Sequence, residues 1–142
     1  MRFRVKRGAL AASLIAVLSA CGGGPAAELN QAMSDEVHGL MKTDGPVTPF
    51  SEMTDWEWDE VHVFDLNDTP RWEIEKLLPV ADLSFPSSGS GLFVYLDDGR
   101  LVRADVIGVD EICPGVYTPT AIVDPKAGCW LRDENMRRFP PT

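Results

Sequence analysis

Two apolar runs separated by a short polar turn constrain the fold of this 142-residue chain more than any other feature. Residues 92–96 and 101–106 are rich in β-forming apolar side chains, and residues 97–100 between them read Asp-Asp-Gly-Arg. A two-residue hairpin turn needs positive φ at both central positions, which Asp98 and Gly99 adopt at little cost. We therefore expect an antiparallel β-hairpin, against which the rest of the domain must pack.

Other segments also have the pattern of β-strands. Residues 58–66 carry apolar side chains on both faces of an alternating pattern, which favours a strand in the interior of a sheet. Residues 120–123 and 129–132 flank the turn-forming residues 124–128. This arrangement predicts a second hairpin.

Two segments have helical periodicity. Residues 26–42 form the first predicted helix, which Gly45-Pro46 terminates. Its apolar face carries Leu29, Met33, Val37, Leu40 and Met41. The second predicted helix covers residues 70–78, with Thr69 as N-cap and Pro70 in the first helical position. Its buried face carries Ile74, Leu77, Leu78 and Ala81.

The N-terminal residues have the layout of a secretory signal peptide. Four cations precede an apolar run over residues 8–20, which is too short to span a bilayer, and a small residue stands before Cys21. Residues 18–21, Leu-Ser-Ala-Cys, resemble the lipobox of bacterial lipoproteins. The resemblance implies cleavage before Cys21 and lipidation of its thiol, with palmitate among the attached acyl groups. Ordinary secretory cleavage after Ala20, leaving a soluble protein, is the alternative.

Lipidation would place the protein in the bacterial cell envelope. Residues 21–27 then comprise the lipidated Cys21 and a Gly-rich, flexible tether. Gly22 follows the cysteine, where an Asp would signal retention in the inner membrane. In a host with two membranes, the resemblance to lipoproteins therefore implies an outer-membrane protein that faces the periplasm.

The order of elements predicts the fold class. Removal of residues 1–20 leaves 122 of 142 residues, enough for one compact domain. Helix, strand, helix and four strands suggest an α+β fold, a mainly antiparallel sheet of about five strands with two helices packed on one face. We expect a single domain over residues 28–132 and a loosely packed C-terminal tail over residues 133–142.

The three cysteines divide into one lipidation site and one pair. In an oxidising compartment, Cys113 and Cys129 are expected to form a disulfide bond. Free thiols or a metal site are alternatives, but neither cysteine has a further Cys or His nearby in sequence. We expect no metal and no other cofactor.

Charge excludes one class of partner. Without the signal peptide, nine Lys and Arg face 22 Asp and Glu, a net charge of −13. Phosphate backbones would be repelled, so no nucleic-acid binding is expected. A basic envelope protein would be attracted, although an acidic surface also serves solubility alone.

Several residues of the sequence are of types that serve as catalytic or binding groups. Residues 55–60 alternate acids with Trp56 and Trp58, but Glu60 stands where a calcium loop needs glycine, so we expect the tryptophans to pack and the acids to face water. His38 and His62 are the only histidines, and the Ser-rich residues 87–91 do not form the Gly-x-Ser-x-Gly elbow of hydrolases. No catalytic residue is assigned.

Two resemblances bear on function. Residues 58–64, Trp-Asp-Glu-Val-His-Val-Phe, together with the helix and strand that follow, resemble small uncharacterised bacterial secreted lipoproteins, a group that implies no activity. Residues 86–91 with Tyr95 resemble the Ser-Gly loop of membrane-bound lysozyme inhibitors. We therefore expect a non-catalytic, membrane-anchored interaction module. A periplasmic lysozyme inhibitor and a small envelope hydrolase are the alternatives.

Overall fold

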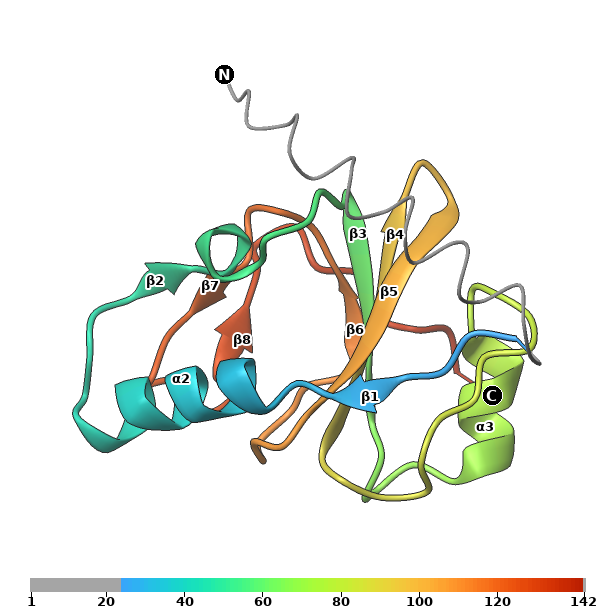
Figure 1. Ribbon diagram of the computed structural model, residues 1–142. Coiled ribbons are helices and arrows are strands. Elements are labelled where there is room, and N and C mark those ends of the chain that lie inside the picture. The colour runs from blue at the N-terminus through green and yellow to red at the C-terminus, as the bar shows by residue number, and fades with distance from the viewer. Residues whose placement is uncertain (1–23, 142) are drawn as a thin grey trace.

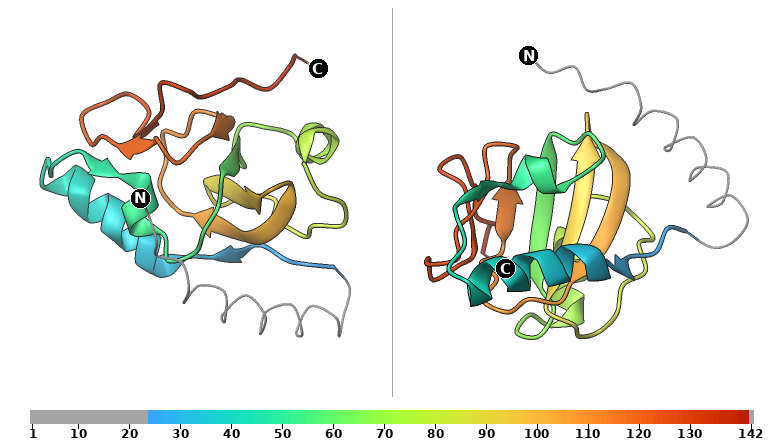
Figure 2. Two further views of the ribbon diagram at one scale, coloured as in Figure 1. Left: turned by 90° about the horizontal axis from the view of Figure 1, so that it is seen from above. Right: turned by 60° about the vertical axis from the view of Figure 1, so that its left-hand side comes forward.

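The computed structural model describes residues 24–141 as an α+β fold built on two sheets (Figures 1 and 2). The larger sheet has five strands in the order β1-β5-β4-β3-β6, and the smaller has three in the order β2-β7-β8. The helical elements are α2 (Gln31–Lys42), the 3-10 helix η1 (Phe50–Met53) and α3 (Arg71–Leu77). The strands are β1 (Glu28–Leu29), β2 (Thr48–Pro49), β3 (Glu60–Asp65), β4 (Gly91–Asp97), β5 (Arg100–Ile107), β6 (Gly115–Tyr117), β7 (Ile122–Val123) and β8 (Leu131–Arg132).

The expected central hairpin is confirmed. Strands β4 and β5 pair antiparallel, from Gly91 opposite Ile107 to Asp97 opposite Arg100. Asp98 has φ 55° and Gly99 has φ 78°, so both central positions of the turn are left-handed. This is the conformation that a tight hairpin turn requires, and it explains why Asp-Gly stands there.

The larger sheet is mainly antiparallel, as predicted, but it is a mixed sheet because one edge strand pairs in parallel. Three of its strand pairs are antiparallel, but β1 pairs parallel to β5, with Glu28 opposite Asp105. The prediction of one sheet was also incomplete. The second predicted hairpin does form, with Val123 opposite Leu131, but it joins β2 in a separate three-stranded sheet.

The two helices lie against different faces of the larger sheet, which corrects the expectation that both pack on one face (Figure 1). Alternation along β4 sends Phe93 and Tyr95 into one core cluster and Val94 into the other. Helix α2 contributes Val37 to the first cluster, and α3 contributes Ile74 to the second. Because the inner strands are apolar on both faces, each face needs its own cover. Sequence order does not say which helix covers which.

Helix α2 begins later than predicted. Asn30 is its N-cap, and the side-chain oxygen accepts a hydrogen bond from the Met33 amide at 3.0 Å. The side-chain nitrogen of Asn30 donates to the carboxylate of Asp105 at 2.9 Å. These two bonds end the extended chain at Asn30, and Leu29 therefore lies on β1, 57% exposed, rather than on the apolar helix face.

Helix α3 occupies the predicted region with a different start. Pro70 is the N-cap, and no side chain caps the helix, so the prediction of Thr69 as N-cap was wrong. Pro70 has φ −62° and ψ 148°, an extended conformation that places the first helical residue at Arg71. Ile74 is buried, whereas Ala81 lies beyond the helix and is exposed.

Both ends of the described chain make contacts with the domain. The Ala27 amide donates to the Ser84 carbonyl at 2.8 Å, and the Ser84 amide donates to the Pro25 carbonyl at 2.9 Å. Residues 25–27 thus pair with the chain that follows α3, although they were expected to be tether. At the other end, Val116 and Arg137 form an antiparallel bridge, a tighter association than the loose tail expected for residues 133–142. No helix within residues 24–141 is long and apolar enough to cross a membrane.

Candidate functional site

A groove of about 990 Å³, which we call the C-terminal groove, opens on the described part of the chain. Its walls come from α3, from the strands β3, β6, β7 and β8, and from the C-terminal segment, residues 133–141. Apolar lining is supplied by Phe64, Leu77, Tyr117, Ile122, Leu131, Met136 and Phe139. Charged lining is supplied by Glu73, Arg132, Asp133, Glu134 and Arg138. This mixture of apolar surface and a few charges is typical of binding pockets.

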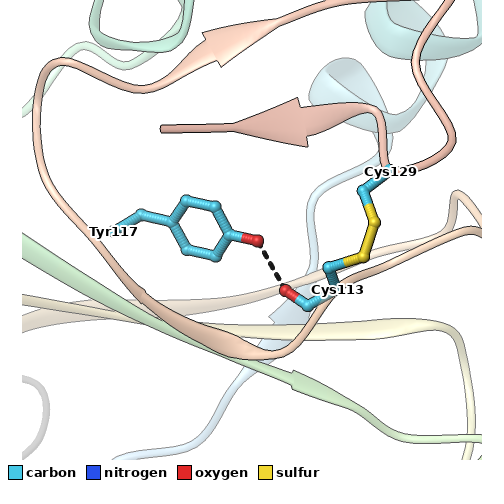
Figure 3. The surroundings of a disulfide bond; sticks show 3 residues. All are labelled: Cys113, Tyr117 and Cys129. Carbon is cyan, nitrogen blue, oxygen red and sulfur yellow. Dashed lines mark hydrogen bonds between the residues drawn. A yellow bond between two sulfur atoms is a disulfide. The ribbon is translucent and has the colours of Figure 1, made fainter. Parts of the chain in front are cut away.

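The disulfide bond between Cys113 and Cys129 borders the groove and confirms the predicted pairing (Figure 3). It joins the segment before β6 to the segment before β8, with Cα atoms 5.7 Å apart. The Tyr117 hydroxyl donates a hydrogen bond to the Cys113 carbonyl. Burial, and to a lesser degree the negative charge of Asp133, raises the pKa of Tyr117 to about 12. The phenol therefore remains a donor that fixes this wall of the groove at physiological pH.

Asp133 organises the turn that follows β8. Its carboxylate accepts hydrogen bonds from the Thr118 amide at 2.6 Å, from the Thr120 hydroxyl at 2.6 Å and from the Asn135 amide at 3.0 Å. Partial burial alone would raise the pKa of Asp133, but these hydrogen bonds outweigh it and lower the pKa. Asp133 is thus a structural carboxylate, already satisfied by its own chain.

The C-terminal segment is held to the domain by backbone and side-chain contacts. Its backbone pairs with Val116 through two hydrogen bonds at Arg137, of 2.8 and 3.0 Å. The Arg137 guanidinium contacts the Glu60 carboxylate at 2.8 Å. Gly115 permits the close approach, because a Cβ there would lie 2.9 Å from the Arg137 carbonyl oxygen. The edge of β6 is therefore covered by the C-terminal segment of the same chain.

His62 lies beside the C-terminal segment, with its ring 6.1 Å from that of Phe139. Its side chain makes one polar contact among the described residues. Its Nε2 is 3.2 Å from the Glu60 carboxylate, and its Nδ1 is buried without a hydrogen-bond partner. Burial lowers the pKa of His62, an effect that the Glu60 carboxylate opposes and the nearby Arg137 cation reinforces. His38, the other histidine, contacts the Gly108 carbonyl at 3.0 Å. Within residues 24–141, neither ring contacts a hydroxyl or thiol that it could activate.

Residues 55–60, the acidic tract, are arranged as the sequence predicted. Trp58 is buried in the core, and the Trp56 ring lies edge-on to Tyr95 with the Arg103 guanidinium 4.0 Å from its centre. The alternate acids, Asp55, Glu57 and Asp59, are exposed. Partial burial raises the pKa of Asp97 at the neighbouring hairpin turn, and the carboxylates of Asp59, Glu57 and Asp98 add to the rise. No group of three or more His, Cys, Asp or Glu side chains in the described residues is placed to hold a metal ion.

The Ser-rich loop lies against its own domain. Ser90 is buried, and its hydroxyl donates to Asp110 at 3.0 Å. The Gly89 amide donates to the Asn67 side chain at 3.3 Å. Ser87 and Ser88 are exposed. Of the loop serines, these two alone are placed to touch another molecule.

The remaining predicted site residue, Cys21, lies outside the described residues. Sequence reasoning missed the groove, because its lining is gathered from distant segments of the chain, such as Phe64 and Phe139, which are 75 residues apart. The one signal in the sequence was the apolar Phe139 within a segment expected to be loose. No family model matches the chain, and no curated protein or solved structure is significantly similar to it.

Proposed function

We propose that this chain is a lipid-anchored protein of the bacterial cell envelope whose folded domain is a non-catalytic binding module. The anchor is proposed from the Leu-Ser-Ala-Cys order of residues 18–21 behind a short apolar run. The protein would reside in the outer membrane and face the periplasm if the host has two membranes.

The C-terminal groove is the observation that carries the binding role. It is bordered by the disulfide and by the stacked rings of Phe64 and Phe139, both of which fix its shape before any ligand arrives. A pre-formed site loses little conformational entropy on binding. A polypeptide segment suits its size and mixed lining better than a single small polar molecule does.

Charge supports a protein partner with a basic surface. The groove is lined by three carboxylates and two guanidinium groups, and the chain without its signal peptide carries −13. Opposite charge on a partner would speed its encounter with the domain. Arg138, which also lines the groove and has no hydrogen-bond or ionic partner among residues 24–141, offers a guanidinium for one carboxylate of that partner.

Site-specific photocrosslinking in intact cells tests this proposal. A photoreactive amino acid replaces Glu134 in the groove or, as the matched control, Glu52 on η1, which is also exposed and lies outside the groove. The proposal predicts one discrete protein adduct from position 134 and none from position 52. Identical adduct patterns from the two positions would contradict a binding role for the groove. The same photoreactive amino acid at the exposed Ser88 tests the inhibitor alternative, which an adduct with a lysozyme from position 88 alone would favour.

A further inference from the structure

The start of the described chain is fixed to the domain rather than separated from it by a long tether. Pro25 and Ala27 exchange two backbone hydrogen bonds with Ser84, and the Gly24 backbone packs so closely against Asp82 that a Cβ would lie 2.5 Å from the Asp82 carbonyl oxygen. Asp82 comes five residues after the end of α3. Figure 1 and the left view of Figure 2 show the beginning of the described chain and α3 at the same end of the molecule.

Chain length limits how far this end can stand from a lipid on Cys21. Three residue steps separate Cys21 from Gly24, and a fully extended chain advances by no more than about 3.6 Å per residue. The two Cα atoms are therefore at most about 11 Å apart. By comparison, α2 alone, with its 12 residues, is about 18 Å long and packs on the other face of the sheet. Lipidation would thus hold the α3 end of the domain close to the membrane.

An exposed tryptophan is present at this end. Trp72 on α3 is 58% exposed, one of three large apolar side chains of the described residues that are left largely uncovered. The other two are Leu29 on β1 and Val47 in the α2–β2 connection. Trp72 is two residues from the buried Ile74, so it points away from the core, and the Lys76 ammonium lies 5.8 Å from the centre of its ring. Tryptophan beside lysine is a combination favoured where hydrocarbon meets lipid headgroups.

The charge of α3 also suits a bilayer. Its cations Arg71 and Lys76 equal its anions Glu73 and Glu75 in number, so the helix is neutral within a chain whose net charge is −13 without the signal peptide. An anionic membrane would repel most of the surface of this domain, whereas the neutral α3 adds no net repulsion of its own.

We propose that the Trp72 face of α3 is a membrane-contact surface, which the short connection to Cys21 holds against the headgroups of the bilayer. This inference rests on the proposed lipid anchor. It also assigns an orientation to the domain, with α3 on the membrane and the α2–β2 connection, at the opposite end in Figure 1, away from it.

Tryptophan quenching in vesicles tests the proposal with the full, processed chain. The lipidated protein is reconstituted into phosphatidylcholine vesicles whose acyl chains carry bromine near the headgroup, a short-range quencher of indole emission. Wild type should lose a component of its emission that the Trp72→Phe variant lacks. The matched control is Val47→Trp in the Trp72→Phe background, which puts an indole at a similarly exposed site (53% for Val47) at the other end. The emission that Val47→Trp adds should be unaffected by the lipid-bound bromine, whereas aqueous iodide should quench it.

The outcomes of this experiment distinguish failure of the membrane-contact surface from failure of the lipid anchor on which it depends. Mass spectrometry of the same sample reports whether Cys21 is lipidated, and absence of the lipid would overturn the anchor. Lipidated protein in which wild type and Trp72→Phe are quenched equally would overturn the membrane-contact surface and leave the anchor standing. Bromine quenching of the emission that Val47→Trp adds would overturn the assigned orientation.

Discussion

The ring of Phe139 stacks on the ring of Phe64, with centroids 4.7 Å apart and planes inclined by 7°. Phe64 belongs to an inner strand and is 1% exposed, whereas Phe139 is only partly buried and lies near the end of the described residues. This contact ties the C-terminal segment to the second core cluster. The segment is therefore part of the fold and forms one wall of the C-terminal groove.

Phe139→Ala should remove the stacking contact with Phe64. Offset aromatic pairs contribute about 0.5–1.5 kcal/mol beyond the burial of their surface. Because Phe139 is only partly buried, we expect the free energy of unfolding to fall by about 1–2 kcal/mol, less than for a fully buried phenylalanine. Urea unfolding measures the change, with Pro141→Ala at the exposed end of the segment as control. Equal stability of the two variants would show that the stack contributes nothing.

The Cys113–Cys129 disulfide should stabilise the groove more strongly. The bond closes a loop with a sequence separation of 16, for which the entropy lost by the unfolded chain corresponds to about 3 kcal/mol. The Cys113→Ser/Cys129→Ser double variant should lose about this much stability in urea unfolding. Non-reducing mass spectrometry of the wild type should find one linked peptide pair. Two alkylatable thiols in protein taken from an oxidising compartment would refute the bond.

Local signals in the sequence predicted the elements better than their assembly. The Asp98-Gly99 turn was predicted correctly because its two positive φ angles are a property of those residues alone. The start of α2 was misplaced, since Asn30 caps the helix while also binding Asp105, 75 residues away. The parallel pairing of β1 with β5, with Glu28 opposite Asp105, lies next to the same long-range contact.

The C-terminal groove could not be predicted from the sequence, because long-range contacts again bring its residues together. Tyr117 and Phe139 line one groove only because β6 pairs with β3 on one side and with Arg137 on the other. Three-residue β6 is too short to give an alternating pattern. By contrast, the disulfide partners could be predicted, because Cys113 and Cys129 are the only cysteines that remain once Cys21 is assigned to lipid.

Asn30→Ala tests the junction between α2 and the sheet. The substitution removes the N-cap of α2 and leaves Asp105, which is 2% exposed, with Arg103 as its remaining side-chain partner. Loss of a cap costs about 0.5–2 kcal/mol, and the loss of one hydrogen bond to the buried carboxylate of Asp105 adds to that cost. We expect a loss of about 1–3 kcal/mol in thermal or urea unfolding. Gln31→Ala, which removes an exposed i,i+4 hydrogen bond to Asp35, should cost far less, and an equal loss from both variants would contradict this role of Asn30.

Asp133 should make part of the stability depend on pH. Its pKa is lower in the folded protein than the ordinary value of 3.8, because the hydrogen bonds from Thr120, Thr118 and Asn135 outweigh burial. The unfolded chain therefore binds the proton more readily, so this stabilisation is fully present above about pH 5 and declines as the pH falls below about 4. The stability difference between wild type and Asp133→Ala should shrink over that range. Glu134→Ala controls for the loss of one negative charge, and a difference that stays constant from about pH 6 to about pH 3 would contradict the assignment.

The lipid anchor is the central claim, and metabolic labelling at Cys21 tests it most directly. Cells that express the full chain are grown with a clickable palmitate analogue, and the protein is captured and probed for label. We predict a labelled wild-type protein in the membrane fraction and no label on Cys21→Ser, which should stay unprocessed or become soluble. Undiminished label on Cys21→Ser, or an unlabelled wild type cleaved after Ala20, would contradict the account.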